Sequence, residues 1–64
     1  MTVWRHPIEA EIGNVALLKF KDAPGVYDED RPFFLHEDGD WYEVKSHCRN
    51  HERVMAFKLV EEQR

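Results

Sequence analysis

The hydrophobic positions of this 64-residue chain recur mainly with a period of two. Residues 8–12 read Ile-Glu-Ala-Glu-Ile, and residues 15–20 read Val-Ala-Leu-Leu-Lys-Phe after the dipeptide Gly13-Asn14. This period is typical of strands, and a glycine in first position suits the type II′ turn of a tight hairpin. The pattern predicts a hairpin of these two segments, preceded by a short extended start at residues 3–6. Residues 15–20 are apolar on both faces, which indicates a central strand.

A second hairpin is predicted around Asp38-Gly39. Residues 33–37 and 40–44 are aromatic or β-branched runs on either side, and both turn residues tolerate the positive φ of a type I′ turn. A two-residue turn sets Leu35 opposite Tyr42, and alternation then sorts the side chains onto two faces. The expected core face carries Phe33, Leu35, Tyr42 and Val44, and the expected exposed face carries Phe34, His36, Trp41, Glu43, Lys45 and His47.

The last segment, residues 52–64, allows two interpretations. It is rich in helix formers, and Asn50 could cap a helix. At helical spacing, however, its apolar residues spread around the whole wheel, whereas a strand places Met55, Phe57 and Leu59 on one face. We therefore favour a strand that continues the second hairpin into a three-strand meander, and keep a terminal helix as the alternative.

These segments predict one small all-β domain spanning residues 1–64. It would have about five antiparallel strands, a hairpin followed by the meander, and would resemble an SH3-like or related small β-barrel. The alternative is an α+β domain with a C-terminal helix. A chain of this length buries only about 60% of its unfolded surface, so self-association as a homodimer would add stability.

Composition indicates a soluble protein of the cytoplasm. Hydrophobic residues make up 42% and charged residues 34% of the chain, and no apolar run is long enough for a signal peptide or a membrane span. The single cysteine, Cys48, cannot form an internal disulfide, which favours a reducing compartment. We expect its thiol to be a small buried apolar group.

The net charge of −4 is unevenly distributed. Residues 1–44 carry ten acids against four bases, whereas residues 45–64 carry five bases against three acids. Such asymmetry concerns association and steering and says nothing about the fold. It provides one candidate surface of each sign.

The first functional hypothesis is a non-catalytic protein-binding module with an acidic docking surface for a basic partner. The connection at residues 21–32 is long for a loop, which makes it a candidate binding loop. The predicted partner-binding residues are Asp28, Glu29, Asp30, Glu37, Asp38 and Trp41. Charge runs of this kind are more often solvated surfaces kept polar for solubility.

The alternative hypothesis is a small β-barrel that binds single-stranded nucleic acid through a basic turn at residues 45–53. Cations would contact phosphates, and Trp41 or Phe34 would offer a stacking surface. The residues concerned are Lys45, His47, Arg49, His51 and Arg53. The acidic isoelectric point, about 5.4, opposes this hypothesis.

Metal binding and catalysis have weaker support. Cys48-x-x-His51 has the spacing of half a zinc site, which His47, His36 or His6 would have to complete, and a second half-site is missing. The chain has neither a glycine-rich phosphate loop nor a nucleophile elbow. We therefore predict no metal, no cofactor and no enzymatic activity.

Overall fold

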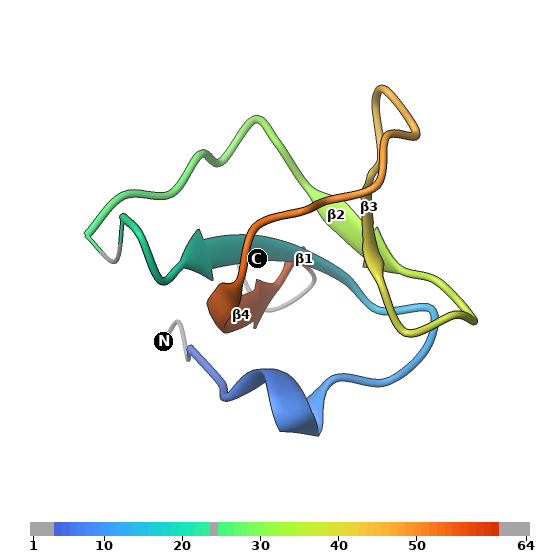
Figure 1. Ribbon diagram of the computed structural model, residues 1–64, viewed down its shortest axis with the longest axis horizontal. Coiled ribbons are helices and arrows are strands. Elements are labelled where there is room, and N and C mark those ends of the chain that lie inside the picture. The colour runs from blue at the N-terminus through green and yellow to red at the C-terminus, as the bar shows by residue number, and fades with distance from the viewer. Residues whose placement is uncertain (1–3, 24, 61–64) are drawn as a thin grey trace.

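The computed structural model describes residues 4–23 and 25–60, which form one antiparallel sheet of four strands (Figure 1). A single turn of 3₁₀ helix, η1, precedes the sheet, and no helix of the described residues could cross a membrane. The strands lie in the order β3-β2-β1-β4, which is the order of a Greek key. The predicted all-β class is confirmed, with four strands in the described part of the chain. The elements are η1 (Pro7–Glu9), β1 (Val15–Phe20), β2 (Phe33–Leu35), β3 (Trp41–Glu43) and β4 (Val54–Leu59).

β1 is central, as its continuous apolar run predicts. It pairs with β2 on one side and with β4 on the other. Three consecutive residues, Ala16, Leu17 and Leu18, are buried. Consecutive side chains of a strand point to opposite faces, so both faces of β1 are covered at these positions. Half of the six residues of this strand are therefore buried.

The core lies on one face of the sheet and draws on all four strands. Phe57 of β4 is only 1% exposed and lies 5.9 Å from Trp41 of β3, measured between ring centroids. Contacts between strands far apart in the sequence therefore hold the fold together. The buried residues of this cluster are Ala16, Leu18, Phe33, Leu35, Trp41 and Phe57.

β4 settles the ambiguity of the last segment. Val54–Leu59 is a strand, so the helical alternative is wrong over these residues, while residues 61–64 lie outside the described part. The strand pairs with β1 and not with β3 as a continued hairpin would require. On its outer side, Arg5 exchanges two backbone hydrogen bonds with Phe57, which confirms the extended start for this residue. The sheet is not closed, so it does not confirm the predicted SH3-like barrel of five strands.

The predicted hairpin of residues 8–12 and 15–20 is wrong. Pro7 begins η1, the imidazole Nδ1 of His6 accepts a hydrogen bond from the Ile8 amide, and Ile8 is 85% exposed. Gly13, at φ +93°, donates its amide to the Leu35 carbonyl. The dipeptide Gly13-Asn14 thus extends the pairing of β1 with β2 and does not reverse the chain between two local strands.

The second hairpin is present, but its register differs by one residue from the prediction. Leu35 lies opposite Trp41, and the His36 amide donates to the Asp40 carbonyl, so the loop contains three residues. Three-residue loops commonly end on a left-handed residue, and Gly39 has φ +87°. A shift of one residue exchanges the faces of a strand, so Trp41 is buried and Tyr42 lies on the outer face.

Replacing Gly39 by valine should destabilise the protein by about 1–2 kcal/mol, because a side chain with a Cβ is strained at this φ. A Cβ at Gly39 would meet no atom within 4 Å, so the expected loss comes from the backbone alone. Thermal unfolding followed by circular dichroism measures it. Gly25 also has open space but no positive φ, so Gly25→Val is the matched control and should change stability little. An equal loss of stability in the two variants would contradict the left-handed conformation of Gly39 in the turn.

Candidate functional site

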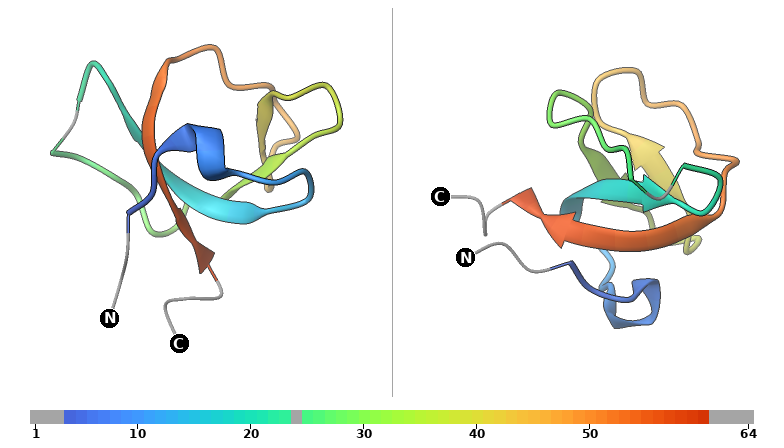
Figure 2. Two further views of the ribbon diagram at one scale, coloured as in Figure 1. Left: turned by 90° about the horizontal axis from the view of Figure 1, so that it is seen from below. Right: turned by 90° about the vertical axis from the view of Figure 1, so that its left-hand side faces the viewer.

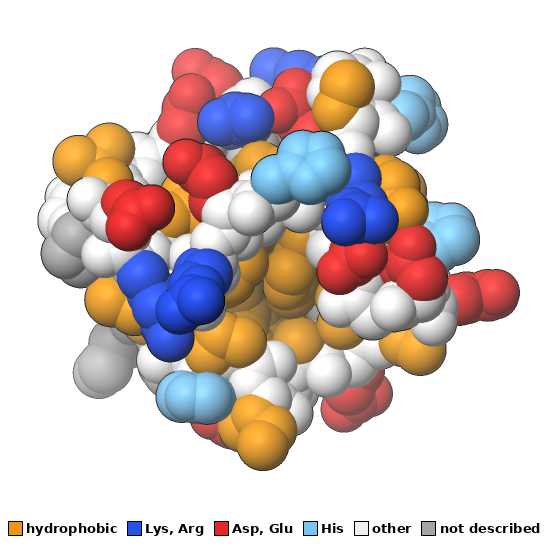
Figure 3. Space-filling model, in the orientation of Figure 1, with side chains coloured by type: hydrophobic (Ala, Val, Ile, Leu, Met, Phe, Trp, Pro, Cys, Tyr) orange, Lys and Arg blue, Asp and Glu red, His pale blue; other side chains and the backbone are white. Residues whose placement is uncertain are grey.

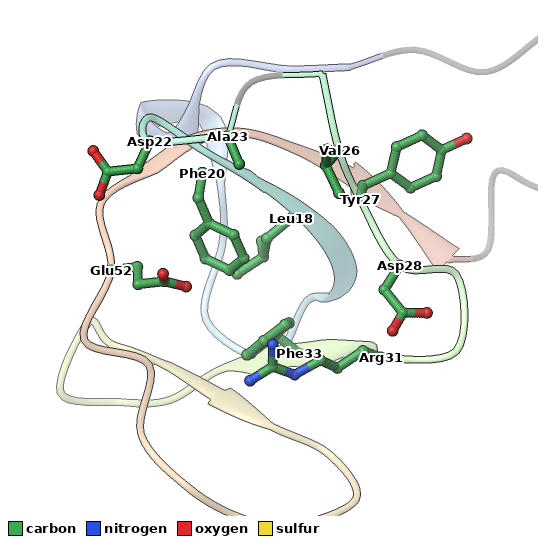
Figure 4. Close-up of a pocket in the computed structure, with 10 residues that line it drawn as sticks. All are labelled: Leu18, Phe20, Asp22, Ala23, Val26, Tyr27, Asp28, Arg31, Phe33 and Glu52. Atoms are coloured by element: carbon green, nitrogen blue, oxygen red, sulfur yellow. The ribbon is translucent and has the colours of Figure 1, made fainter.

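A cleft of about 200 Å³ lies between the loop of residues 21–32, β1, β2 and the segment that leads into β4 (Figure 4). This loop is the one that the sequence indicates as a candidate binding loop. The cleft combines apolar, acidic and cationic side chains from four parts of the chain. The lining residues are Leu18, Phe20, Asp22, Ala23, Val26, Tyr27, Asp28, Arg31, Phe33 and Glu52.

The floor of the cleft is apolar. In Figure 4 the side chains of Leu18, Phe20 and Phe33 gather at its centre. Phe20 and Phe33 make an edge-to-face contact with ring centroids 6.0 Å apart. Leu18 and Phe33 belong to the core cluster, so the cleft is an opening onto the core and its floor is held rigidly.

The rim of the cleft is acidic. Figure 4 shows Glu52 and Asp28 on opposite sides of the opening, whereas Asp22 and the ring of Tyr27 point away. The guanidinium of Arg31 lies 5.2 Å from the Phe33 ring centroid and forms an ion pair with Glu43.

This ion pair neutralises Arg31, the one cation among the described residues that line the cleft. The hydrogen bond from Arg31 lowers the pKa of Glu43 and raises the pKa of Arg31 itself, so both groups are charged at neutral pH. Asp28 and Glu52 also raise the pKa of Arg31 through charge interaction, but neither forms an ion pair with a described residue, so the lining carries more negative than positive charge.

Hydrogen bonds within the loop and to the segment before β4 order the loop over the cleft. The Lys21 amide donates to the Arg53 carbonyl, which ties the start of the loop to the segment before β4. Asp28 accepts the Asp30 amide on its carboxylate at 2.8 Å and the Arg31 amide on its carbonyl. The rim acid Asp28 is therefore a turn residue as well as a charge.

The structure does not gather the predicted acidic docking residues into one surface. Residues 28–30 lie in the loop at one end of the long axis, and the hairpin tip with Glu37 and Asp38 lies at the other end (Figures 1 and 2). All five acids are exposed. Trp41 is 7% exposed in the core, so the expectation that it lies on the exposed face is wrong, because the three-residue loop turns it inward.

Asp38 has a structural role at the hairpin tip. Its carboxylate accepts hydrogen bonds from the Asp40 amide at 2.9 Å and from the Tyr42 hydroxyl at 2.7 Å, which together lower its pKa. The hydrogen bond from the Tyr42 hydroxyl to Asp38 also raises the pKa of Tyr42. These contacts fix the loop and leave Asp38 less available to a partner than the acids of the cleft.

The predicted basic turn is exposed at all five positions and stands beyond the sheet (Figure 1). Arg49 lies 3.6 Å from Asp40, and His47 has a left-handed backbone at φ 61°. Next to the turn, four rings cluster on the outer face of β2 and β3. Phe34 stacks on Tyr42 with centroids 5.8 Å apart, and His36 and His47 also contact Phe34.

The candidate metal ligands do not converge. Cys48 is exposed, contrary to the expectation of a buried thiol, because it lies in the turn after β3 and not within a strand. Over residues 4–23 and 25–60 no group of three histidine, cysteine or acidic side chains could hold a metal ion. On the face shown in Figure 3, acidic, basic and histidine side chains are interspersed around an apolar hollow. Positive and negative charges are therefore mixed on this face and do not form one broad patch of a single sign.

Sequence reasoning identified the loop and Asp28 but missed Glu52, Arg31 and the apolar floor. Glu52 is distant in sequence and reaches the cleft only because β4 returns to β1. The usable signal was Phe20 and Phe33, large apolar residues at the two borders of an acidic loop. No family model matches the chain, and no similar protein was found among the curated proteins or the solved structures.

Proposed function

We propose that this chain is a small, non-catalytic protein-binding module that takes up a lysine or arginine side chain of a partner protein in the cleft. One observation carries the proposal: an apolar floor of Leu18, Phe20 and Phe33 lies beneath a rim with the carboxylates of Asp28 and Glu52. Lysine and arginine combine an apolar stem with a cationic head. The stem would lie on the two phenylalanine rings, and the head would reach the acids.

The size of the cleft favours one side chain over a metabolite. Sites for small molecules usually measure about 300–1,000 Å³, whereas this cleft measures about 200 Å³. It is also open to solvent along an exposed loop. A partner segment could pass over the loop while one of its basic residues enters the cleft.

Glu29 and Asp30 follow Asp28 in the loop, and both side chains are exposed. With the net charge of −4, they would steer a basic partner toward the cleft. Exposed charges of this kind raise association rates more than affinity, and salt screens them beyond about 10 Å at 0.1 M. The proposal therefore assigns contact to Asp28 and Glu52, and steering to Glu29 and Asp30.

The second candidate function is single-stranded nucleic-acid binding on the outer face of the hairpin. It is supported by the ring cluster of Phe34, His36, Tyr42 and His47, which lies next to the basic turn. Bases stack on exposed aromatic rings while cations contact phosphates. Asp38 and Asp40 border this face and repel phosphates, so the cleft remains the better supported site.

The test is an NMR titration of the ¹⁵N-labelled protein with the peptide acetyl-Gly-Ser-Lys-Ser-Gly-amide and with its arginine analogue. We expect saturable shifts for amides of the loop 21–32 and of Glu52. Asp28→Asn with Glu52→Gln should weaken binding about three- to tenfold, since exposed charge pairs contribute roughly 0.2–1 kcal/mol each. Asp28→Asn keeps the oxygen that accepts the Asp30 amide, so the loop should stay folded.

Two controls separate this contact from general attraction. Glu9→Gln with Glu37→Gln removes the same charge from exposed positions away from the cleft and should leave affinity nearly unchanged. A peptide with norleucine in place of lysine keeps the stem and should bind more weakly. Equal losses for both double variants, or stronger binding of a single-stranded oligothymidine at the ring cluster, would overturn the proposal.

A further inference from the structure

A cluster of two lysines and two aromatic residues lies beside the cleft and takes no part in the proposed function. Lys58 Nζ is 4.7 Å from the ring centroid of Tyr27 and 5.1 Å from that of Trp4. Lys19 Nζ is 4.4 Å from the ring centroid of Trp4 and 5.7 Å from that of Tyr27. The two rings meet edge to face, with centroids 5.0 Å apart. Both ammonium groups are thus held against one aromatic pair.

The register of the sheet explains this convergence. Leu17 lies opposite Lys58 in the pairing of β1 with β4, so Lys19, two residues along β1, is the diagonal neighbour of Lys58 on the same face. This is the face opposite the core cluster. Trp4 joins it because Arg5, the next residue, pairs with Phe57 at the outer edge of β4. The position of the lysines is therefore set by the backbone and does not depend on flexible side chains alone.

The charge of this cluster is unbalanced within the described residues. Lys58 is only 4% exposed, although lysine is rarely buried without a partner. Neither lysine forms an ion pair with a carboxylate of residues 4–23 or 25–60. Aromatic faces attract each ammonium but do not cancel the repulsion between the two. Two cations held close together on a half-covered face would be stabilised by an anion that contacts both.

We propose that Lys19 and Lys58, framed by Trp4 and Tyr27, form a binding site for an oxyanion, either a phosphate group or a carboxylate. Each ammonium offers three donors, and an oxyanion offers several acceptor oxygens to share between them. The site is distinct from the cleft. Tyr27 borders both, so an anionic group and a basic side chain of one partner segment could be bound side by side.

The experiment is a titration of the whole ¹⁵N-labelled chain with inorganic phosphate, and separately with acetate, at constant ionic strength adjusted with sodium chloride. The readout is the indole N–H signal of Trp4, assigned with Trp4→Phe. We expect a saturable shift with at least one of the two anions. The stronger binder identifies the phosphate or the carboxylate as the preferred group.

Lys58→Met and Lys19→Met keep an apolar stem and remove the charge. Each should weaken binding about tenfold, the loss of one charge-assisted hydrogen bond. Lys45→Met, at an exposed lysine of the turn 45–53, is the matched control and should bind like the parent protein. If Lys58→Met fails to fold, Lys19→Met carries the test, because Lys19 is only half-buried.

Three results would overturn the proposal. One is the absence of a saturable shift for the folded parent protein with both anions. Another is equal binding by Lys19→Met and Lys45→Met. The third is binding that appears only after Glu61→Gln with Glu62→Gln, which would assign the lysine pair to acids of the chain itself.

Discussion

Phe57→Ala is expected to destabilise the protein by about 3–5 kcal/mol, the cost of removing a buried phenylalanine and leaving a cavity. Phe57 is 1% exposed, contacts Trp41, and belongs to a core built from all four strands. A domain of this size has a total stability of only about 3–10 kcal/mol. The variant should therefore be largely unfolded at 25 °C, which amide chemical-shift dispersion and urea titration would show.

Ile8→Ala is the matched control, because Ile8, at 85% accessible, is the most exposed large apolar residue in the part of the chain that the structure describes. Its loss should change stability by less than about 0.5 kcal/mol. A dispersed, native-like spectrum for Phe57→Ala would place β4 outside the core. Such a result would contradict the pairing of β4 with β1 and, with it, the position of Glu52 at the cleft.

Trp41→Ala is the second large effect, again about 3–5 kcal/mol, and it tests the register of the hairpin. Trp41 is 7% exposed beside Phe57, while Tyr42 lies half-buried on the outer face. Tyr42→Ala loses the stacking on Phe34 and the hydrogen bond to Asp38, which together should cost about 1–2 kcal/mol. Denaturant unfolding of both variants measures the difference.

The two-residue turn that the sequence suggests would reverse this order, because it places Tyr42 in the core and Trp41 outside. A larger loss for Tyr42→Ala than for Trp41→Ala would therefore contradict the three-residue loop. Asp-Gly is compatible with both loop lengths, since each ends on a residue with positive φ. Local turn chemistry alone could not choose between them, and the burial of Trp41 against Phe57 decides the register.

The sequence predicted the strands correctly where their apolar residues are buried in the core. β1 reads as central because both of its faces are apolar, and β4 reads as a strand because its apolar residues fit a period of two better than a helix. The alternation of Ile8 and Ile12 was misleading. Both side chains are exposed, and His6 and Pro7 start a helical turn at this point.

The candidate site was only partly predictable for the same reason. The acidic loop and Asp28 are visible in the composition of residues 21–32. Glu52 and the lysine pair depend on the return of β4 to β1, a long-range pairing that no local pattern specifies. The proposed function and the oxyanion site both rest on that one pairing.

Intermolecular NOEs test the central claim most directly, because they identify the protein atoms that a basic side chain contacts. The protein, saturated with the lysine peptide, should show NOEs between the methylene protons of the peptide lysine and the ring protons of Phe20 and Phe33. These rings form the floor of the cleft beneath Asp28 and Glu52. NOEs to Phe34 and Tyr42 on the outer face of the hairpin, with none to the floor, would contradict the account.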